Sequence, residues 1–446
     1  MKRSPGWLHL FVVAAALAAI SSGRAAEAVP VPAQPELPID LPTALRLAGA
    51  QNLDVQLARE KLALAKASRD IAVQQFFPWL APGIAYRRHD NQIQDTTGTI
   101  LDVHKQSYAV GGTLTAQVDL GEAWYRELAA RQFVKAAEHG LDAQREQTVW
   151  QAALAYFDLV RAHAGEDIAR DALRIATEYE GQVRNAVEAG IALKGDVLRA
   201  QVQAEQGRVA LRNAQKEARV AAARLAQVLR LDSQVELAPS SIELAPISLV
   251  STNTKLDHLV GQALASRPEL KERQALLTAA RTERRGAVVG PLVPTVGAQV
   301  FAGGLGGGRG GALGNFGDQE TYAIGVGWRI GPGGLFDRAR LRAADSRLNT
   351  SRLAAEKLAD DVTREVVEAY TEVNAQGDQI ENTRRALAAA QQALQWAKER
   401  KEFNVGVVLE HIQAQLDYTR ARQYYVRAVV DFNKAQYTLR RATGGF

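Results

Sequence analysis

The sequence contains one glycine-rich pattern that could bind a phosphate group. Gly306-x-Gly308-x-x-Gly311 has the spacing of a dinucleotide-binding loop, in which a pyrophosphate lies at a helix N-terminus. Such a loop must follow a strand and open a helix within a βαβ unit. Here alternating apolar and polar residues follow the motif and predict another strand. We therefore interpret Gly303 to Gly311 as a flexible loop and expect no cofactor.

The histidines do not have the paired spacing of metal ligands. Six of the seven lie outside the N-terminal segment: His89, His104, His139, His163, His258 and His411. His411 directly follows Glu410, which suggests a metal-sensing pair, but adjacent helical residues point about 100° apart. We interpret this pair as a solvated helix face. P-loop, zinc-protease and hydrolase motifs are also absent from the sequence, so we expect no metal site and no enzyme.

Composition points to long, closely packed helices. The chain has 446 residues, of which 47% are hydrophobic, 23% charged and only 6% aromatic. These values allow a sizeable core and argue against general disorder. The chain has no cysteine, which excludes disulfides, cysteine-ligated zinc, thiol catalysis and an acylated N-terminal cysteine.

The N-terminus has the pattern of a secretory signal. Lys2 and Arg3 precede an apolar stretch from Leu8 to Ile20, and Ala26-Glu27-Ala28 fits the cleavage site. A short membrane anchor is the alternative, but about 13 apolar residues cannot span a bilayer. Removal of residues 1–28 would lower the net charge from +5 to +3, which weakens any case for nucleic-acid binding. The proline-rich residues 29–42 predict an extended segment.

The rest of the chain consists of two copies of one unit. Ala155-Tyr156 matches Ala369-Tyr370, Gly190 matches Asn404, and Asp196 matches Glu410, all at the same offset along the chain. We place the repeats at 41–231 and 256–446, with a connector at 232–255.

Each repeat predicts helix, strand, strand, very long helix, tight turn and helix. The first helix, at 43–77, ends before Pro78, because proline cannot continue a helix. Long helices are expected at about 122–189 and 337–403, each about 100 Å long at 1.5 Å per residue. Apolar residues three and four apart form a seam on the first of these: Ile168, Ala172, Ile175, Tyr179, Val183 and Ala186. After the turns, the chain returns in helices at 194–231 and 408–443.

The strands have one apolar face each. In the first repeat this face includes Tyr108, Val110 and Leu114, which alternate with small or polar residues. In the second repeat it comprises Tyr322, Ile324, Val326 and Trp328. Transmembrane strands show this alternation over about 9–11 residues. A strand of a soluble sandwich alternates in the same way, but the export signal and the lack of a third strand per repeat favour the membrane.

Four strands cannot close a barrel, and open edges are not tolerated in lipid. The chain must therefore oligomerise into a barrel of a multiple of four strands, and this argument alone does not give the number of copies.

The order of motifs, including Ala155-Tyr156-Phe157-Asp158-Leu159, Asp196-Val197-Leu198 and Gln436-Tyr437-Thr438-Leu439, resembles the TolC-like outer-membrane efflux family over essentially the whole mature chain.

The resemblance implies a mainly α fold with a β-barrel portion. A homotrimer would form a 12-stranded transmembrane barrel on a long α-helical periplasmic tunnel. It also implies a passive exit duct in the outer membrane that works with a periplasmic adaptor and an inner-membrane pump. The transported substrate and the class of pump are not readable from the sequence. A periplasmic coiled-coil adaptor or scaffold without a pore is the alternative.

The turns between the long and the returning helices are expected to form the closed, pump-facing end of the tunnel. The residues expected at this aperture are Gly190, Asp196, Asn404, Gly406 and Glu410. The two acidic residues match the acidic positions of the family, but the second turn has Asn404 where glycine is usual. Whether these side chains face the lumen is left open by the sequence.

Overall fold

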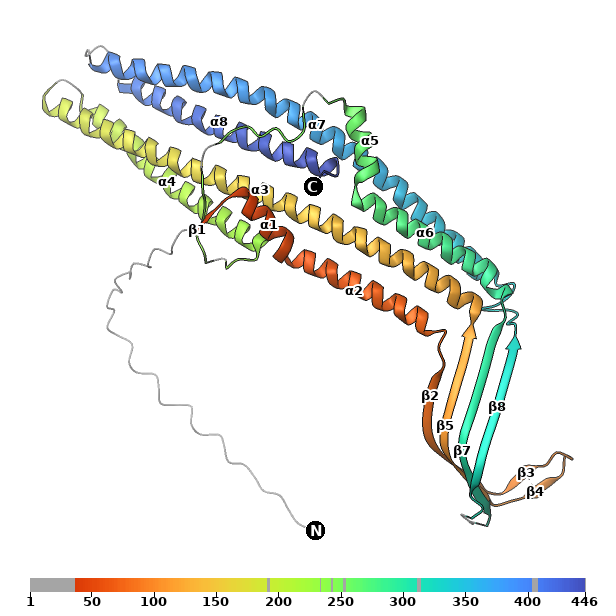
Figure 1. The fold of residues 1–446 in the computed structure, drawn as a ribbon. Helices are drawn as coiled ribbons and strands as arrows, with labels where there is room; N and C mark the ends of the chain where they lie inside the picture. Colours follow the sequence, from red (N-terminus) through yellow and green to blue (C-terminus); the bar gives the residue numbers. More distant parts are fainter. Residues whose placement is uncertain are drawn as a thin grey trace, which may run out of the picture. The chain divides into compact units, whose positions relative to one another are not determined.

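The structure is a computed structural model that describes residues 37–190, 193–232, 234–241, 244–251, 254–310, 314–402 and 408–445 (Figure 1). The expected signal peptide, most of the extended N-terminal segment, and the turn residues Asn404 and Gly406 lie outside the described residues.

The first repeat follows the predicted order of elements. Its elements are α1 (Leu41–Gln51), α2 (Leu53–Gln74), β2 (Trp79–His89), β5 (Lys105–Asp119), α3 (Leu120–Glu188) and α4 (Lys194–Leu229), with a small ribbon of β3 (Gln92–Gln94) and β4 (Ile100–Asp102) in the loop between β2 and β5. The prediction of one helix over 43–77 was wrong, because Asn52 divides it. Asn52 leaves helical geometry at ψ 139°, and its Oδ1 accepts a 2.7 Å hydrogen bond from the Asp54 N–H, which starts α2 as an N-cap.

The second repeat has the same order. Its elements are α5 (Leu256–Ser266), α6 (Pro268–Val289), the 3-10 turn η1 (Gly290–Leu292), β7 (Thr295–Arg309), β8 (Gly317–Gly327), α7 (Arg338–Glu402) and α8 (Val408–Ala442). Here the first helix is divided at Arg267, and Pro268 occupies the first position of α6, where proline is tolerated.

The glycine-rich segment is not the loop we expected. Residues 303–309 are the second half of β7, which pairs with β5 along its whole length. A Cβ atom on Gly303 would collide with the backbone of β5 at Val110, so the glycine permits a close approach of two strands. The strand assignment also excludes the strand–loop–helix context that nucleotide binding would need.

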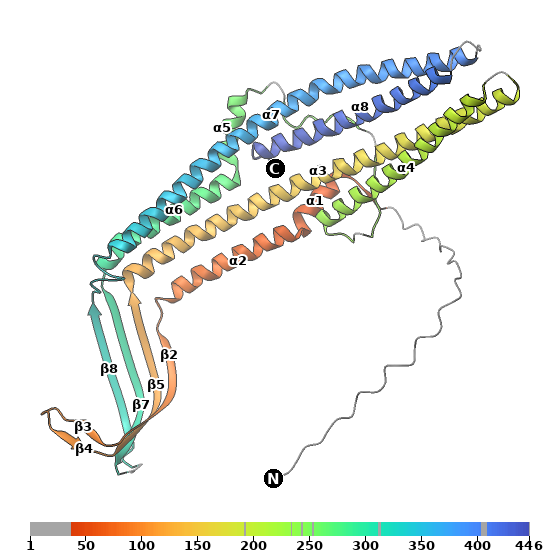
Figure 2. The same ribbon diagram turned by 180° about the vertical axis from the view of Figure 1, so that it is seen from behind.

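The four long strands form one antiparallel sheet in the order β2-β5-β7-β8 (Figure 2). The repeats meet in its centre, where β5 of the first pairs with β7 of the second along the full length of both strands, from Lys105↔Arg309 to Asp119↔Thr295. Strands β2 and β8 are the two edges. Each strand runs into, or out of, one of the helices α2, α3, α6 and α7.

The long helix α3 is the structural centre of the helical part. It packs against α2 and α4 of its own repeat and against α6 and α8 of the other. The predicted seam is confirmed: Ile168, Tyr179 and Val183 are buried, and the other three seam residues are half-buried. Helix α7 packs in the same way against α6 and α8 of its own repeat.

The connector between the repeats is held by amides on α8. The Asn433 side chain accepts from the Ile247 N–H and donates to the Ala245 carbonyl, while Gln436 Oε1 accepts from the N–H groups of Leu249 and Val250. A short strand β6 (Leu237–Pro239) in the connector also pairs in parallel with β1 (Leu37–Ile39). Buried side-chain amides therefore satisfy backbone groups that have no place in a sheet or helix.

Candidate functional site: sheet face, helix turn and inter-repeat network

The strand register places the predicted membrane residues on one face of the sheet. Val110 lies opposite Ile84 of β2, and Leu114 lies opposite Leu80. Across the other strands, Leu114 lies opposite Val300, which in turn lies opposite Tyr322 of β8. Ile84 and Ile324 are 80% and 83% exposed in the single chain. The same face therefore carries a continuous, exposed apolar surface across all four strands.

Two aromatic side chains, Tyr108 and Trp328, lie toward the ends of this sheet. Tyr108 stacks on Phe316 with a ring-centroid distance of 5.8 Å. Trp328 lies one residue beyond β8, and its indole N–H donates to the Leu292 carbonyl at 3.1 Å. Tyr322 lies instead at the middle of β8, where it donates a 2.9 Å hydrogen bond to Glu320. Amphipathic rings with one polar contact suit a boundary between lipid and water.

The opposite face of the sheet carries mostly small or polar side chains, with exceptions such as Phe301 and Trp79. Thr113, Thr115 and Gln117 of β5 alternate with the apolar residues. Their register partners on β7 are Phe301, Gln299 and Gly297. One apolar and one largely polar or small-residue face is the pattern of a strand between lipid and a water-filled interior.

The first predicted turn is a helix end followed by a helix start. Gly190 has φ +74°, in the left-handed region that favours glycine, and its N–H donates to the Val187 carbonyl. Asp196 lies in the first turn of α4, where it forms a 3.0 Å ion pair with Arg199. In the second repeat, Glu410 forms a 2.9 Å ion pair with Arg400 of α7. Both predicted acidic residues are thus neutralised by an arginine in the single chain.

His411 is not on a solvated face, so our interpretation of the Glu410–His411 pair was wrong. His411 is 5% exposed and its ring stacks on Tyr179 of α3 at 4.2 Å. Burial and the charge of Asp196 raise the pKa of Tyr179 to about 12, so its hydroxyl stays protonated. The ring pair joins α8 to α3 beside Val183 and Ile412. Val408, three residues before His411 and therefore on the same side of α8, is apolar and could have indicated that this side is buried.

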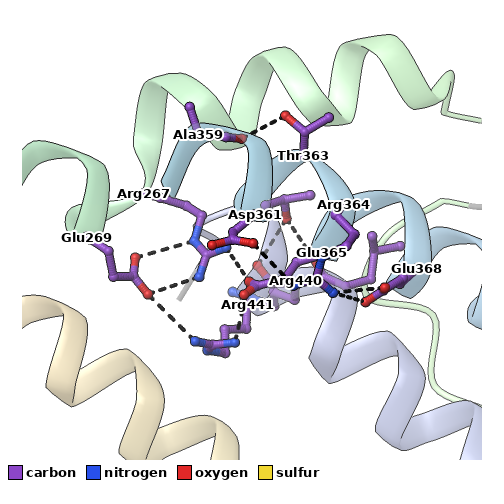
Figure 3. A network of polar contacts seen from close by, with 12 residues as sticks. Arg267, Glu269, Ala359, Asp361, Thr363, Arg364, Glu365, Glu368, Arg440 and Arg441 are labelled. Carbon is purple, nitrogen blue, oxygen red and sulfur yellow. Dashed lines mark hydrogen bonds and ion pairs between the residues drawn. The ribbon is translucent and has the colours of Figure 1, made fainter. Parts of the chain in front are cut away.

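A buried ionic network lies where the second repeat divides its first helix (Figure 3). The Arg267 side chain is 3% exposed and donates to Glu365 of α7 at 2.6 Å and to both carboxylate oxygens of Glu269 at 3.0 and 3.3 Å. Arg441, near the end of α8, approaches the same two carboxylates at 3.7 and 3.9 Å. Two arginines and two glutamates thus join α6, α7 and α8.

The first repeat contributes α3 to this network. The Arg441 guanidinium lies 4.9 Å from the centre of the Trp150 ring, a cation–π contact. Burial and the negative charge of Glu269 raise the pKa of Glu146 to about 7, while Arg267 and Arg441 oppose the shift. We did not predict this network. An arginine directly before a proline at a helix boundary was its one signal in the sequence.

The described residues contain no group of three or more histidine, cysteine, aspartate or glutamate side chains that could hold a metal ion. Within the same part of the chain, none of the helices combines the length and apolar character that crossing a membrane requires.

The chain resembles known outer membrane efflux proteins. The sequence pattern of the outer membrane efflux protein family matches residues 44–229 and 259–445. The chain is similar to the outer membrane efflux protein BepC of Brucella suis, with 26% identity over 339 residues, 74% of this chain and 72% of that protein.

Solved structures agree on the fold. The CmeC outer membrane channel of Campylobacter jejuni matches with a TM-score of 0.80 and 16% identity, over 91% of this chain and 85% of that chain. The open state of the Neisseria gonorrhoeae MtrE outer membrane channel matches with a TM-score of 0.75 and 18% identity, over 91% and 89% of the two chains. With both repeats covered by the family pattern, the chain belongs to the outer membrane efflux protein family.

Proposed function

We propose that this outer-membrane efflux protein is the passive exit duct of a tripartite efflux or type I secretion system. The observation that carries the proposal is the four-stranded sheet with one continuous apolar face and two open edges, joined to helices of 65 and 69 residues. The sheet supplies a wall that suits lipid, and the helices have the length to reach far into the periplasm. Substrates would pass through without chemistry, driven by an inner-membrane pump.

Closure of the sheet requires further copies of the chain. Edge strands in lipid leave backbone groups without hydrogen bonds, which costs several kcal/mol per group. In the structure, β5 of the first repeat already pairs with β7 of the second. Since the repeats share one architecture, the equivalent pair is β8 of the second repeat with β2 of the next copy. Three copies would give the 12-stranded barrel and helical tunnel of the family.

The helices support the same closure. Inside the chain α6 packs against α3, and Gly286 of α6 lies against the Tyr125 ring. The equivalent helix of the first repeat is α2, and alignment of the two helix starts places Ile71 at the position of Gly286. Leucines recur on the same side of α2, and all these side chains are exposed in the single chain: Leu57 60%, Leu64 68% and Ile71 59%. This stripe fits α7 of a neighbouring copy.

Export would follow the usual secretory route. We propose cleavage after Ala28 and extended residues 29–42, with repeats at 41–231 and 256–446 around the connector at 232–255. The mature chain would have no lipid anchor, because it has no cysteine, so the barrel alone would hold it in the membrane. The partners would be a periplasmic adaptor and the pump. We propose no enzymatic activity, no cofactor and no nucleic-acid binding.

Imaging and conductance test this proposal. Protein extracted in detergent from outer membranes should form hollow cylinders with threefold symmetry in negative-stain micrographs and conduct ions in a planar bilayer. Single chains recovered without detergent would contradict the barrel. That outcome would favour a pore-free periplasmic scaffold, which otherwise leaves the apolar face of the sheet unexplained.

Deletion of the helix turns tests the position of the pump-facing end. We propose that Gly190, Asp196, Asn404, Gly406 and Glu410 lie at this end. Removing residues 190–193 or 403–407 should abolish export while the trimer persists in mild detergent. Export that survives both deletions would place the contact with the partners elsewhere.

A further inference from the structure

The end of the sheet that lies farthest from the helices carries basic side chains on the polar face. Lys105, the first residue of β5, lies opposite His89 of β2 and opposite Arg309, the last residue of β7. Arg87 precedes His89 by two residues and therefore lies on the same face of β2. The long helices join the sheet at its other end (Figure 1). We call Arg87, Lys105 and Arg309 the mouth cations.

The mouth cations have no ion pair with a carboxylate in the part of the chain that the structure describes, and all three residues are exposed. Asp90, which follows His89, pairs with Arg88 at 2.8 Å and with His104 at 3.1 Å. The positive charge at this end of the polar face is therefore not neutralised within the described residues, and it can act on a charged solute.

The stability of the sheet does not explain these charges. Lys105 and Arg309 lie directly opposite each other, an arrangement in which like charges destabilise a pair of strands. The polar face of the four described strands carries one carboxylate, Asp119, at the opposite end, where its side chain caps α3. An arrangement that costs stability without compensation is typical of a functional site.

The acidic residues near this end of the sheet lie on the apolar face instead. Asp318 and Glu320 lie on the same side of β8 as Tyr322. Arg88 is on the apolar face of β2, but it is already paired with Asp90. Phosphate groups of the surrounding lipid would therefore meet carboxylates, whereas a solute inside the proposed barrel would meet the mouth cations.

Short side chains line the polar face next to the mouth cations. Ser107 lies between Arg87 and Gly307 in the next row of the register. A row of three glycines follows farther in: Gly83, Gly111 and Gly303. Within the four described strands, the mouth cations are therefore the fixed charges that a solute meets in this half of the polar face.

We infer that the mouth cations form a positive ring inside the barrel and that the duct releases anionic solutes in preference to cationic ones. The inference rests on the proposed function, because only a ring of copies places these side chains around an interior. Rings of arginine and lysine select anions in pores, and a wall of one charge raises the local concentration of counterions. The substrate class that fits this exit is organic molecules with carboxylate, sulfonate or phosphate groups.

Binding of inorganic triphosphate tests the ring, because this polyanion contacts several cations at once. One variant combines Arg87→Gln, Lys105→Gln and Arg309→Gln, and isothermal titration calorimetry of detergent-solubilised trimers measures the dissociation constant at low salt. The combined variant should bind triphosphate about tenfold or more weakly than the native chain. Raising the ionic strength from about 0.1 to 1 M should weaken native binding, because the Debye length falls from about 10 to 3 Å.

Two control variants separate charge from structure. Arg87→Lys combined with Arg309→Lys keeps the charges and should bind triphosphate within about twofold of the native affinity. Arg87→Gln alone should weaken binding several-fold, whereas Arg88→Gln removes the neighbouring charge on the apolar face and should have little effect. Equal weakening by these two single substitutions, or native affinity in the combined glutamine variant, would overturn the inference.

Conductance measures whether the ring acts on transport. In a planar bilayer with a KCl gradient, the reversal potential of the native duct should lie nearer the chloride value than that of the combined glutamine variant. Triphosphate should block the native duct at a lower concentration from one side of the bilayer than from the other. Trimers that conduct with the same reversal potential in both proteins would leave the duct intact and refute only the role of the mouth cations.

Two further outcomes would place the anion elsewhere. Triphosphate binding that lipopolysaccharide displaces would assign the anion site to the lipid-facing side and overturn the interior ring. Single chains in place of trimers in the micrographs would refute the proposed function, and the ring with it, before any binding is measured.

Discussion

In the first repeat the division between α1 and α2 falls at Asn52, and in the second the division between α5 and α6 falls at Arg267. Asn52 turns to its own repeat: its amide donates to the Val228 carbonyl of α4 at 2.9 Å. Arg267 instead pairs with Glu269 and Glu365, in a network that extends through Arg441 to α3 of the first repeat.

The same backbone break therefore has two side-chain solutions. At the first break, the neutral Asn52 amide forms a hydrogen bond within its own repeat. At the second break, the buried Arg267 guanidinium belongs to an ionic network that joins the two repeats. The two repeats therefore share the backbone break between their first two helices, but the side chains at the equivalent positions make different contacts. A buried, hydrogen-bonded ion network is costly to disturb once formed, so the second break should be the more sensitive one.

The largest effect is expected from Arg267→Met. The substitution leaves Glu269 and Glu365 with only the longer contacts to Arg441, so the free energy of unfolding should fall by about 3–5 kcal/mol. Thermal unfolding of the detergent-solubilised protein measures the change. Arg273→Met, at an exposed position of the same helix, should have little effect. Similar losses in both variants would show that the network adds no special stability.

Glu146 should make the free energy of unfolding depend on pH. Its pKa is raised to about 7 in the fold, so the fold favours the protonated carboxyl, and this contribution is lost as the pH rises from about 4.5 to 7. After allowance for partial exposure, we expect a loss of about 1–2 kcal/mol over that range.

Glu146→Gln should remove this dependence. The variant should match the native chain near pH 4.5 and exceed it in stability near pH 8, as measured by thermal unfolding across pH. Glu188→Gln, at an exposed position at the end of the same helix, should keep the native pH profile. Parallel profiles of the native chain and Glu146→Gln would rule out Glu146 as the titrating group.

Asn52→Ala should cost less than Arg267→Met. It removes the cap on α2 and the hydrogen bond to α4, which together are worth about 1–2 kcal/mol. Thermal unfolding again measures the loss. A loss as large as that of Arg267→Met would show that the two helix breaks contribute equally to stability.

The smallest effect is expected from Ser266→Ala in the second repeat. The Ser266 hydroxyl reaches the Thr443 carbonyl at 2.8 Å, a contact of α5 with the end of α8 that parallels the contact of Asn52 with α4. Its loss should lower stability by about 0.5 kcal/mol, because the hydroxyl has one hydrogen to share between this carbonyl and the Gln262 carbonyl, which also lies at 2.8 Å. A loss above that of Asn52→Ala would mean that the hydroxyl, rather than Arg267, holds the second break.

Much of the fold could be predicted from local signals. Pro78 ends the first helical segment just before β2, and the returning helices start at residues 194 and 408, as expected. The alternation of apolar and polar residues along each strand was sufficient to predict its apolar face. The strand register places these faces side by side across all four strands. These features depend on backbone chemistry and on periods of two or 3.6 residues, which a single sequence displays.

The errors share a physical cause. The glycines of 303–309 could be assigned to a strand only once β5 lay beside them, because glycine has no side chain to show a period. His411 was taken for a surface residue because its partner, Tyr179, lies in the other repeat, far away in the sequence. The ionic network joins four helices that no local pattern links.

The sequence by itself determined the duplicated order of elements, the lengths of the long and returning helices and which strand residues share a face. Those properties follow from local steric rules and from hydrophobic periodicity. The tertiary structure decided which positions form contacts between the two repeats, such as Arg267 but not Asn52, and the Tyr179–His411 ring pair. Such choices depend on distances between residues far apart in the chain, and only packing brings those residues together.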